Sequence, residues 1–361
     1  MDEEAHVGDG GVTLQDVAER AGLSLATASR VLNGSNRSVG EQTAARIRRV
    51  ADELGYVSNG PAQALARSAT AVVGLLVHEV DDPYFASIAS GAMVVAAEQN
   101  LLTTLACTFH DPEREVQYVQ RMQAQRVRAL LLAGSGTTAA QHRDALNNAL
   151  ASFERGGGRV ALISEHDLPY PSVLPANASG AAHVARHLHD LGHRNVGIVT
   201  GPPSLITVRD RLSGFSKAWA ALGHDVDTLP IVDGGFSRAG GYSAMLELAR
   251  RQPQLTAVFA LNDLMAVGAM AALTEVFECR VPEDVSVIGF DDLWIAKDLR
   301  TPLTTVRLPL EEMGASAMQL VLDQSSEADA RPGNVHVPTD LIVRASSAPP
   351  PAGRRALAPP D

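Results

Sequence analysis

Two short patterns in the chain have residue types that could bind a cofactor or a metal. The segment GSGTTA (134–139) matches G-x-G-x-x-A, a glycine pattern that lets a backbone approach a dinucleotide phosphate. It follows the third apolar segment of its region, whereas the fingerprint belongs after the first strand, and no acidic residue is evident at a neighbouring strand end. His183 and His187 have the spacing of two metal ligands on a helix, but no acid or cysteine partner is evident. We therefore expect no nucleotide cofactor and no metal, and we interpret the histidines as a solvated helical face.

Motifs of hydrolases and nucleotide-hydrolysing enzymes are missing from the sequence. It contains no H-E-x-x-H, no G-x-S-x-G and no Walker loop. This pattern favours a binding protein over an enzyme, and an oxidoreductase that uses the glycine loop is retained as an alternative.

The stretch LSLATASRVLNG (23–34) indicates a different kind of chemistry, the recognition of a large surface. A helix that only packs would surround its apolar stripe with long charged side chains. This one carries small residues and a single arginine, Arg30, near its exposed face. Such a helix is shaped to lie close against a partner.

Local signals around this stretch predict three short helices. Thr13 and Asp16 have the spacing of a capping box, and Gly22 supplies a left-handed stop after about Ala21. After a three-residue turn, Ser24 can cap a second helix that runs to about residue 32 and has Ala28, Val31 and Leu32 on its inner face. Two helices joined by a tight turn with glycine predict a helix-turn-helix, followed by a third helix over about 41–54.

Charge is distributed unevenly along a chain whose net charge is −11. Residues 1–11 carry four acids, whereas residues 12–70 hold seven arginines against five acids. A mildly basic N-terminal segment followed by an acidic remainder is compatible with a small DNA-binding module attached to a larger domain. The acidic, glycine-rich start does not resemble a signal peptide, no apolar run is long enough to span a membrane, and there are two cysteines, so we expect a cytoplasmic protein.

From residue 71 onward, apolar strands alternate with amphipathic helices. The first series of strands is AVVGLLV, LLTTLACT, ALLLAG and RVALIS, and the second is NVGIVTG, TLPIV, AVFALND and VSVIGFDD. Two consecutive sets of β-α-β units predict two doubly wound parallel-sheet lobes, with ligands bound beyond the carboxyl ends of the strands.

The N-terminal sequence resembles the DNA-binding domain of the lactose-repressor/galactose-repressor (LacI/GalR) family. The similarity rests on VTLQDVAERAGLSLATASRVLNGS followed by RIRRVADELGYVSN, and it continues to about residue 348. In such modules the second helix enters the major groove. The resemblance places Leu25 and Ala26 at the positions that choose bases and Arg30 where it can contact guanine. The remaining DNA contacts that we expect in this module are Thr13, Thr27, Ser29 and Asn33.

The segment SNGPAQALARS (58–68) matches the hinge helix of the same family, which folds on DNA. The resemblance places Leu65 as the leucine that wedges a central base step in the minor groove, whereas a plain linker would not need a large apolar side chain there. The other expected DNA contacts in the hinge are Asn59, Ala62 and Ala66.

The resemblance also implies a sensor domain built like a periplasmic sugar-binding protein. It assigns effector contacts to the strand ends, with Arg211 gripping hydroxyls or a carboxylate, facing Asp291 across a cleft lined by aromatic side chains. The complete expected set is Phe85, Ser135, Ser164, Thr207, Arg211, Phe236, Asn262 and Asp291. Ser164 stands where the family usually has an aspartate, and Ala176–Asn177 stands where it often has Asp-Asn. The loss of an acceptor leaves the ligand open: a smaller sugar, another sugar or a non-sugar.

These inferences predict a helix-turn-helix domain over residues 12–58, between an acidic disordered tail (1–11) and a hinge helix (59–69). An effector-binding and dimerisation domain follows over 70–346. Its first lobe is expected to comprise about 70–175 with 293–324, its second lobe about 176–292 with 325–346, and the proline-rich residues 347–361 are expected to be disordered.

The function that we expect is that of a ligand-responsive transcription repressor. It binds a pseudo-palindromic DNA operator as a homodimer and responds to a small molecule, a sugar or related metabolite, and it has no membrane partner. The alternative is a solute-binding protein of a sugar transporter, which the N-terminal module opposes.

Overall fold

The computed structural model describes residues 12–33, 39–56, 70–323, 333–353 and 357. The chain divides into two units, residues 1–70 and 71–361. The expected acidic tail and the hinge residues 59–69 lie outside the described residues. Among the helices that are described, none has the length and hydropathy required to cross a membrane.

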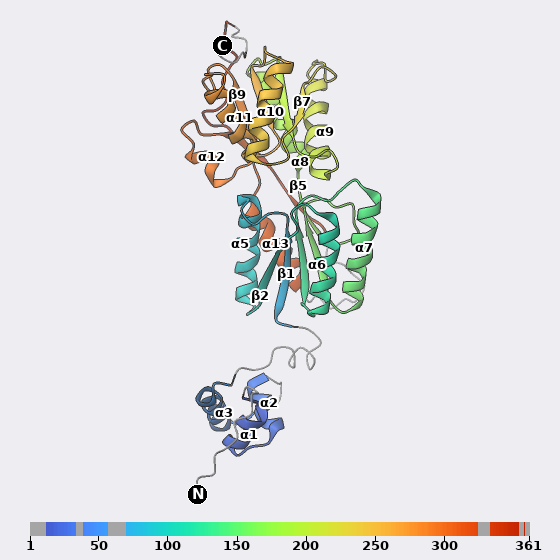
Figure 1. Cartoon of the computed structure of the whole chain (residues 1–361), viewed down its shortest axis with the longest axis vertical. Helices are drawn as coiled ribbons and strands as arrows, with labels where there is room; N and C mark the ends of the chain where they lie inside the picture. The colour runs from blue at the N-terminus through green and yellow to red at the C-terminus, as the bar shows by residue number, and fades with distance from the viewer. Residues whose placement is uncertain (1–11, 34–38, 57–69, 324–332, 354–356, 358–361) are drawn as a thin grey trace. The chain divides into compact units, whose positions relative to one another are not determined.

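The N-terminal unit contains helices α1 (Leu14–Ala21), α2 (Leu25–Asn33) and α3 (Glu41–Leu54) (Figure 1). Thr13 and Asp16 form the predicted capping box, and Gly22 ends α1 in a left-handed conformation with φ of 62°. The backbone N–H of Thr27 donates to Oγ of Ser24 over 3.2 Å, which caps α2 as predicted. The three helices enclose a small core of Val17, Ala18, Ala21, Ala28, Ile47, Val50 and Ala51. The predicted helices are therefore confirmed.

The second unit has two six-stranded sheets in the part of the chain that the structure describes. The first sheet has the order β11-β5-β4-β3-β1-β2 with parallel neighbours. Its strands are β1 (Val72–Val77), β2 (Leu102–Cys107), β3 (Ala129–Ala133), β4 (Arg159–Ile163), β5 (Ser172–Pro175) and β11 (Val335–Val337).

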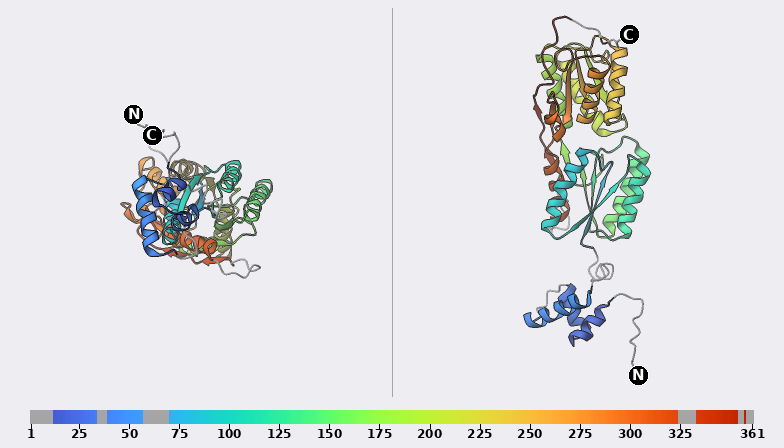
Figure 2. Two further views of the ribbon diagram at one scale, coloured as in Figure 1. Left: turned by 90° about the horizontal axis from the view of Figure 1, so that it is seen from below. Right: turned by 60° about the vertical axis from the view of Figure 1, so that its left-hand side comes forward.

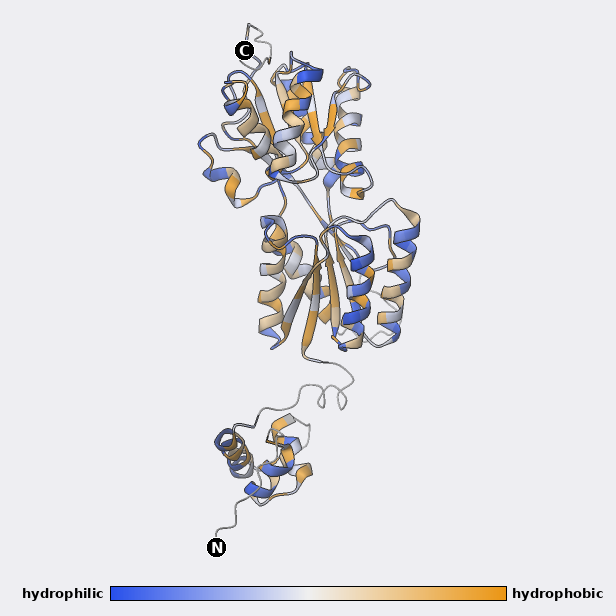
Figure 3. Ribbon diagram, in the orientation of Figure 1, coloured by the Kyte–Doolittle hydropathy of each residue, from blue (hydrophilic) through white to orange (hydrophobic). Residues whose placement is uncertain are grey.

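The second sheet has the order β12-β10-β9-β8-β6-β7 and is parallel apart from the β10–β12 pair. Its strands are β6 (Val196–Thr200), β7 (Ile231–Asp233), β8 (Ala257–Ala260), β9 (Ser286–Asp291), β10 (Thr304–Arg307) and β12 (Asp340–Ile342). Central strands such as β3, β8 and β9 are buried on both faces, which explains their continuous apolar sequences (Figure 3).

Helices cover the sheets in pairs. In the first lobe α5 packs against α13 and α6 against α7, on opposite faces of the sheet (Figures 1 and 2). In the second lobe α8 packs against α9 and α10 against α11. The bounds are α5 (Pro83–Glu98), α6 (Pro112–Ala124), α7 (Ala140–Arg155), α8 (Asn177–Asp190), α9 (Ile206–Ala221), α10 (Arg238–Arg251), α11 (Asp263–Glu275), α12 (Trp294–Asp298) and α13 (Leu310–Leu322).

The expected lobe boundaries after residue 292 are wrong. β10 pairs with β9 in the second sheet, so the chain returns to the first lobe only at α13, which packs on α5. β11 then pairs with β5 in the first sheet before β12 joins the second. The chain therefore passes between the lobes three times, after β5, β10 and β11. The last passage occurs because β11 forms the edge strand of the first sheet and β12 the edge strand of the second.

The expectation of disorder from residue 347 is also wrong for residues 347–353. Ser346 is fully buried, and the backbone N–H of Ala348 donates to Oγ of Ser286 over 3.0 Å. Nε2 of His193 lies 2.9 Å from the carbonyl oxygen of Ala348. Specific polar contacts with the second lobe thus hold this segment despite its proline-rich composition.

Candidate functional site

A cleft lies between the two lobes, at the carboxyl ends of their strands. It is lined from the first lobe by residues that follow β1, β2 and β3. From the second lobe it is lined by residues at the start of α9, by residues that follow β7 and β8, and by the last residue of β9. Seven of the eight expected effector residues line it: Phe85, Ser135, Thr207, Arg211, Phe236, Asn262 and Asp291. The structure brings these residues together from positions up to about 200 residues apart, as expected where parallel strands end at a common edge.

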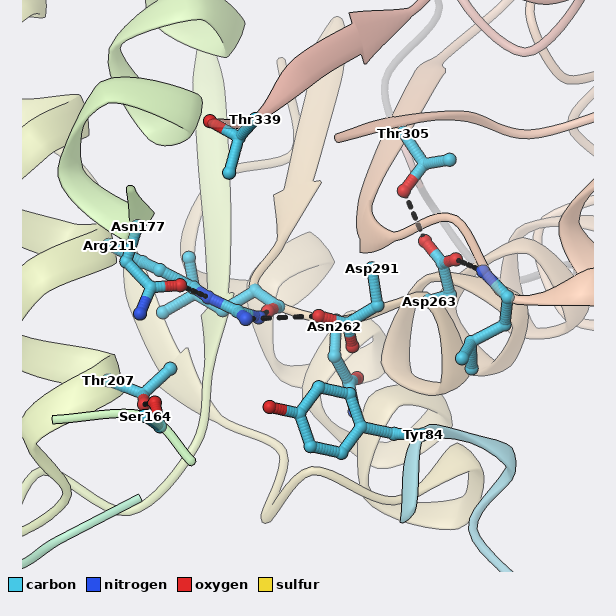
Figure 4. A network of polar contacts seen from close by, with 12 residues as sticks. Tyr84, Ser164, Asn177, Thr207, Arg211, Asn262, Asp263, Asp291, Thr305 and Thr339 are labelled. Carbon is cyan, nitrogen blue, oxygen red and sulfur yellow. Dashed lines mark hydrogen bonds and ion pairs between the residues drawn. The ribbon is translucent and has the colours of Figure 1, made fainter. Parts of the chain in front are cut away.

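Arg211 and Asp291 form a buried ion pair within the second lobe and do not face one another across the cleft as expected. Nη2 of Arg211 donates to Oδ1 of Asp291 over 3.0 Å, and both side chains are almost fully buried (Figure 4). Nε donates to Oδ1 of Asn177 over 2.9 Å, and Nη1 donates to the carbonyl oxygen of Leu261. The guanidinium also lies 3.7 Å from the centroid of the Phe290 ring. Three of the five N–H groups are therefore engaged, and the other two have no hydrogen-bond partner among the described residues.

Burial determines the electrostatics of this pair. It raises the pKa of Asp291 to about 7, although the neighbouring Arg211 acts in the opposite direction. Asp291 and Asp292 both have positive φ, 112° and 57°, a conformation that is uncommon outside glycine. Strained backbone of this kind is concentrated at binding sites, where it aims a side chain at a ligand.

Asp82 and Tyr84 are cleft residues that the sequence reasoning missed. Oδ1 of Asp82 accepts the backbone N–H of Tyr84 over 2.8 Å and caps α5. Burial raises the pKa of Asp82 to about 6, and burial also raises the pKa of Tyr84, whose ring lies near Asp291 and Asn262 (Figure 4). The Asp-Pro pair at 82–83, a cap followed by proline at the first helical position, was the signal that could have located them. Phe85 was expected to contact the effector. It belongs to the lining of the cleft, but only 6% of its surface is exposed, so most of the residue packs in the core.

Phe236 and Asn262 form one wall of the cleft in the second lobe. Nδ2 of Asn262 donates to the carbonyl oxygen of Phe236 over 3.1 Å, and its Oδ1 accepts the N–H of Met265 over 2.9 Å. Phe236 has φ of 58°, and a Cβ on Gly201 would collide with its ring, so the glycine makes room for this aromatic wall. Asn262 therefore holds the backbone of Phe236 in place and also caps the N-terminus of α11.

Ser135, Ser164 and Thr207 connect the two lobes. Oγ of Ser135 accepts the N–H of Thr207 over 2.9 Å, and the carbonyl oxygen of Gly136 accepts the N–H of Ile206 over 2.9 Å. Helix α9 has no side-chain cap in its own lobe, so the loop after β3 satisfies its first N–H groups. Ser164 does not line the cleft: it is buried, with its hydroxyl 3.4 Å from that of Thr207.

Asp263 is a buried carboxyl at the start of α11 whose role is structural. It accepts the N–H of Leu293 over 2.7 Å and the hydroxyl of Thr305 over 2.5 Å (Figure 4). Burial raises its pKa. The bonds hold the segment that follows β9, and with it the backbone of Asp291.

The N-terminal unit presents α2 as expected. Leu25 is 48% exposed, and Ala26 and Arg30 are also exposed, while Thr27 and Ser29 are half-buried. The remaining expected DNA contacts divide into two groups. Thr13 caps α1 and Asn33 ends α2, whereas Asn59, Ala62, Leu65 and Ala66 lie outside the described residues.

The histidines at 183 and 187 are not joined by further ligands. Among the residues that the structure describes, no group of three or more His, Cys, Asp or Glu side chains could hold a metal ion. Nε2 of His187 lies 3.0 Å from Oγ of Ser347 and so contributes to holding the C-terminal segment.

Comparison with known proteins extends over both units. A model of the lacI family of bacterial regulatory proteins matches residues 13–59, and a periplasmic binding protein-like domain matches residues 185–347. The HTH-type transcriptional regulator DegA of Bacillus subtilis (strain 168) is 30% identical over 339 residues, which cover 93% of this chain and 98% of DegA. The HTH-type transcriptional regulator CelR of Thermobifida fusca is 33% identical over 344 residues, covering 92% of this chain and 98% of CelR.

Solved structures give the same result. The Lac repressor dimer bound to operator and the anti-inducer ONPF matches with a TM-score of 0.80 and 26% identity, over 94% of this chain and 100% of that chain. The complex of the transcriptional regulator CelR with cellobiose matches with a TM-score of 0.68 and 31% identity, over 93% of this chain and 100% of that chain.

A helix-turn-helix unit followed by a two-lobed binding unit defines a ligand-responsive, DNA-binding transcriptional regulator. The chain belongs to the lacI family of bacterial regulatory proteins.

Proposed function

We propose that the protein is a cytoplasmic repressor that binds a pseudo-palindromic DNA operator as a homodimer. Its affinity for the operator changes when a small sugar, or a related polyhydroxylated metabolite, binds in the cleft between the lobes. A solute-binding protein of a transporter, the alternative, would have no use for the N-terminal unit.

The DNA-binding part of the proposal is supported by the face of α2. Leu25, Ala26 and Arg30 are exposed together on a short helix, and the unit's core lies under Ala28. An apolar side chain can contact a thymine methyl, a small one allows close approach, and a guanidinium can donate two bonds to guanine. We propose that Asn59, Ala62, Leu65 and Ala66 complete this surface in the minor groove.

The ligand part of the proposal is supported by the Arg211–Asp291 pair, the observation on which it chiefly depends. The pair presents two unused N–H groups and a carboxylate beside the aromatic wall of Phe236. Charged donors and acceptors of this kind bind hydroxyl groups well, and an aromatic ring stacks on the apolar face of a sugar. The similarity to CelR, whose solved complex contains cellobiose, supports the same ligand class.

Dimerisation is supported by apolar side chains on one side of the first lobe. Met93 and Val94 on α5 and Leu102 on β2 are 38%, 58% and 72% exposed. Exposed apolar groups on neighbouring elements favour a subunit interface, and a two-fold dimer matches a two-fold operator.

The proposal can be tested by selecting operators from random duplexes with the full-length protein and then measuring gel shifts. We expect specific binding that weakens steeply with salt, because phosphate contacts dominate the affinity. A chain lacking residues 1–70 should lose this binding. Specific binding that persisted without those residues would show that the proposal is wrong.

A further inference from the structure

The glycine-rich segment GSGTTA (134–139) of the first lobe is bonded directly to the second lobe. It follows β3, and its residue Thr137 pairs with Leu205, which lies between β6 and α9, as an isolated antiparallel bridge. We call this contact between residues 134–139 and 202–206 the inter-lobe clasp. The glycine pattern therefore serves a contact within the protein.

Backbone hydrogen bonds close the clasp on both sides of the bridge. The N–H of Ile206 donates to the carbonyl oxygen of Gly136 over 2.9 Å, and the N–H of Thr138 donates to that of Ser204 over 2.8 Å. The hydroxyl of Thr138 donates to the same oxygen of Ser204 over 3.1 Å. Three hydrogen bonds thus join the loop after β3 to the loop after β6, in addition to the bond between Ser135 and α9 described above.

The first lobe holds its half of the clasp through close packing around two glycines. The N–H of Gly136 donates to the carbonyl oxygen of Glu165 over 3.0 Å, and a Cβ on Gly136 would lie 2.4 Å from Cα of His166. A Cβ on Gly134, which has φ of 128°, would lie 2.5 Å from Nε2 of His78. Only glycine lets the loop run this close to the segment after β4 and to the His78 ring.

The second lobe depends on the clasp because helix α9 begins there. This helix starts at Ile206 and has no side-chain cap of its own. The N–H groups of Ile206 and Thr207 donate instead to Gly136 and Ser135 of the first lobe. Unbonded N–H groups at a helix start need another partner, and the side chain of Ile206 is fully buried. Separating the lobes here would remove these acceptors and expose an apolar side chain to water.

The side of the cleft next to β1 has no such attachment. In the first sheet the crossover strands β11 and β5 are followed in order by β4 and β3, which support the clasp, and β1 lies beyond β3. Asp82 and Tyr84 follow β1, and Tyr84 faces Asn262 across the cleft (Figure 4). Among the described residues, no hydrogen bond or ion pair links Asp82 or Tyr84 to the wall formed by Phe236 and Asn262.

We propose that the inter-lobe clasp stays closed and forms the fixed side of a hinge. The clasp and the chain crossovers define the axis about which the lobes rotate. The cleft then opens only on the side of β1, between Tyr84 and the wall formed by Phe236 and Asn262, and a ligand enters and leaves there. This goes beyond the proposed function, because the clasp joins the lobes whichever ligand the cleft binds.

Amide hydrogen exchange of the full-length protein, without DNA or ligand, tests the clasp. The amides of Thr138 and Ile206 should exchange at least about 100-fold more slowly than unprotected amides, because exchange requires the clasp to open. Gly136→Ala should speed both amides at least about tenfold, since its Cβ would push the loop away from His166. Gly333→Ala is the matched control, because a Cβ there meets no atom within 4 Å, and both amides should be unchanged. Unprotected amides in the wild type, or equal exchange in the two variants, overturn the proposal.

A disulfide across the bridge tests whether this side of the cleft moves. Thr137 and Leu205 lie opposite each other between the two backbone bonds, a pairing that places Cα atoms about 4.5 Å apart, within the span of a disulfide. Thr137→Cys/Leu205→Cys should cross-link on mild oxidation. The oxidised protein should bind a selected operator with a dissociation constant within about twofold of that of the reduced protein, because the clasp is already closed.

Thr137→Cys alone is the control for oxidation of Cys107 and Cys279. A pair that does not cross-link, or a larger change of operator affinity on oxidation, overturns the proposal. A protein that binds no operator contradicts the proposed function alone, because the exchange rates are measured without DNA.

Discussion

Replacing Arg211 by methionine removes the cation from a buried pair and leaves Asp291 without its partner. Both side chains are 3% exposed, so water cannot replace the lost contacts. Breaking a buried pair in this way costs about 3–5 kcal/mol. At about 2–4 °C per kcal/mol, the melting temperature should fall by roughly 6–20 °C. The cost should grow as the pH rises above about 7, the pKa of Asp291 in the wild type, because the wild-type carboxyl ionises there beside Arg211. Without Arg211, which lowers this pKa, the buried carboxyl of the variant has to keep its proton or carry an unpaired charge.

The double variant Arg211→Met/Asp291→Asn separates the unpaired charge from lost packing. Asparagine tolerates the positive φ of residue 291 and carries no charge. We expect the double variant to melt at a higher temperature than Arg211→Met at pH 8, measured by differential scanning calorimetry on the full chain. A fall of less than about 2 °C for Arg211→Met, or equal melting of the two variants, would refute the reasoning that the pair is buried and coupled.

Three further predictions concern other parts of the chain. Arg30→Ala should weaken operator binding about 5- to 150-fold, the range for one bidentate base contact, with unchanged melting; unchanged affinity would remove Arg30 from the DNA surface. Ser135→Ala removes the acceptor of the Thr207 N–H at the start of α9, which is worth about 1 kcal/mol, and should speed hydrogen exchange of that amide about fivefold. Ser204→Ala is the control, and equal exchange in both variants would contradict the cap. Asp82→Asn should keep the cap of α5 and become progressively more stable than the wild type between about pH 4 and 6. Asp82 has a pKa of about 6 in the folded wild type but ionises near pH 4 in the unfolded chain. The wild type therefore loses stability as the pH rises between these values, whereas the asparagine variant does not. Thermal melts across this range check the difference, and a constant difference would contradict it.

The parts of the fold that local signals specify could be predicted from the sequence. The capping box at Thr13 and the left-handed stop at Gly22 depend on residues within one turn of the helix. Buried parallel strands such as β3 read as continuous apolar runs, so the eight main strands were found. The strands β5, β10, β11 and β12 were missed because each is short and interrupted by polar residues or proline, so none forms a continuous apolar run.

Contacts that depend on the folding of distant segments could not be predicted. Arg211 and Asp291 are 80 residues apart, and only the assembled sheet shows that they pair within one lobe. Ser135 and Thr207 are 72 residues apart and belong to different lobes, so the role of Ser135 as a cap for α9 was not visible. The lobe boundaries failed for the same reason, because β10 and β11 exchange sheets through pairing with β9 and β5.

The central claim is that one chain binds DNA through α2 and changes that binding through the cleft. Fluorescence anisotropy of a labelled, selected operator, titrated with the tightest-binding sugar, tests it most directly in the wild type and in Arg211→Lys. Lysine keeps the charge next to Asp291 but lacks the planar fork, so both proteins should bind the operator equally without ligand. The wild type should change its operator affinity at least about tenfold on adding sugar, and Arg211→Lys should need a much higher sugar concentration for the same change. Identical sugar titrations for the two proteins, or an operator affinity that no sugar alters, would contradict the account.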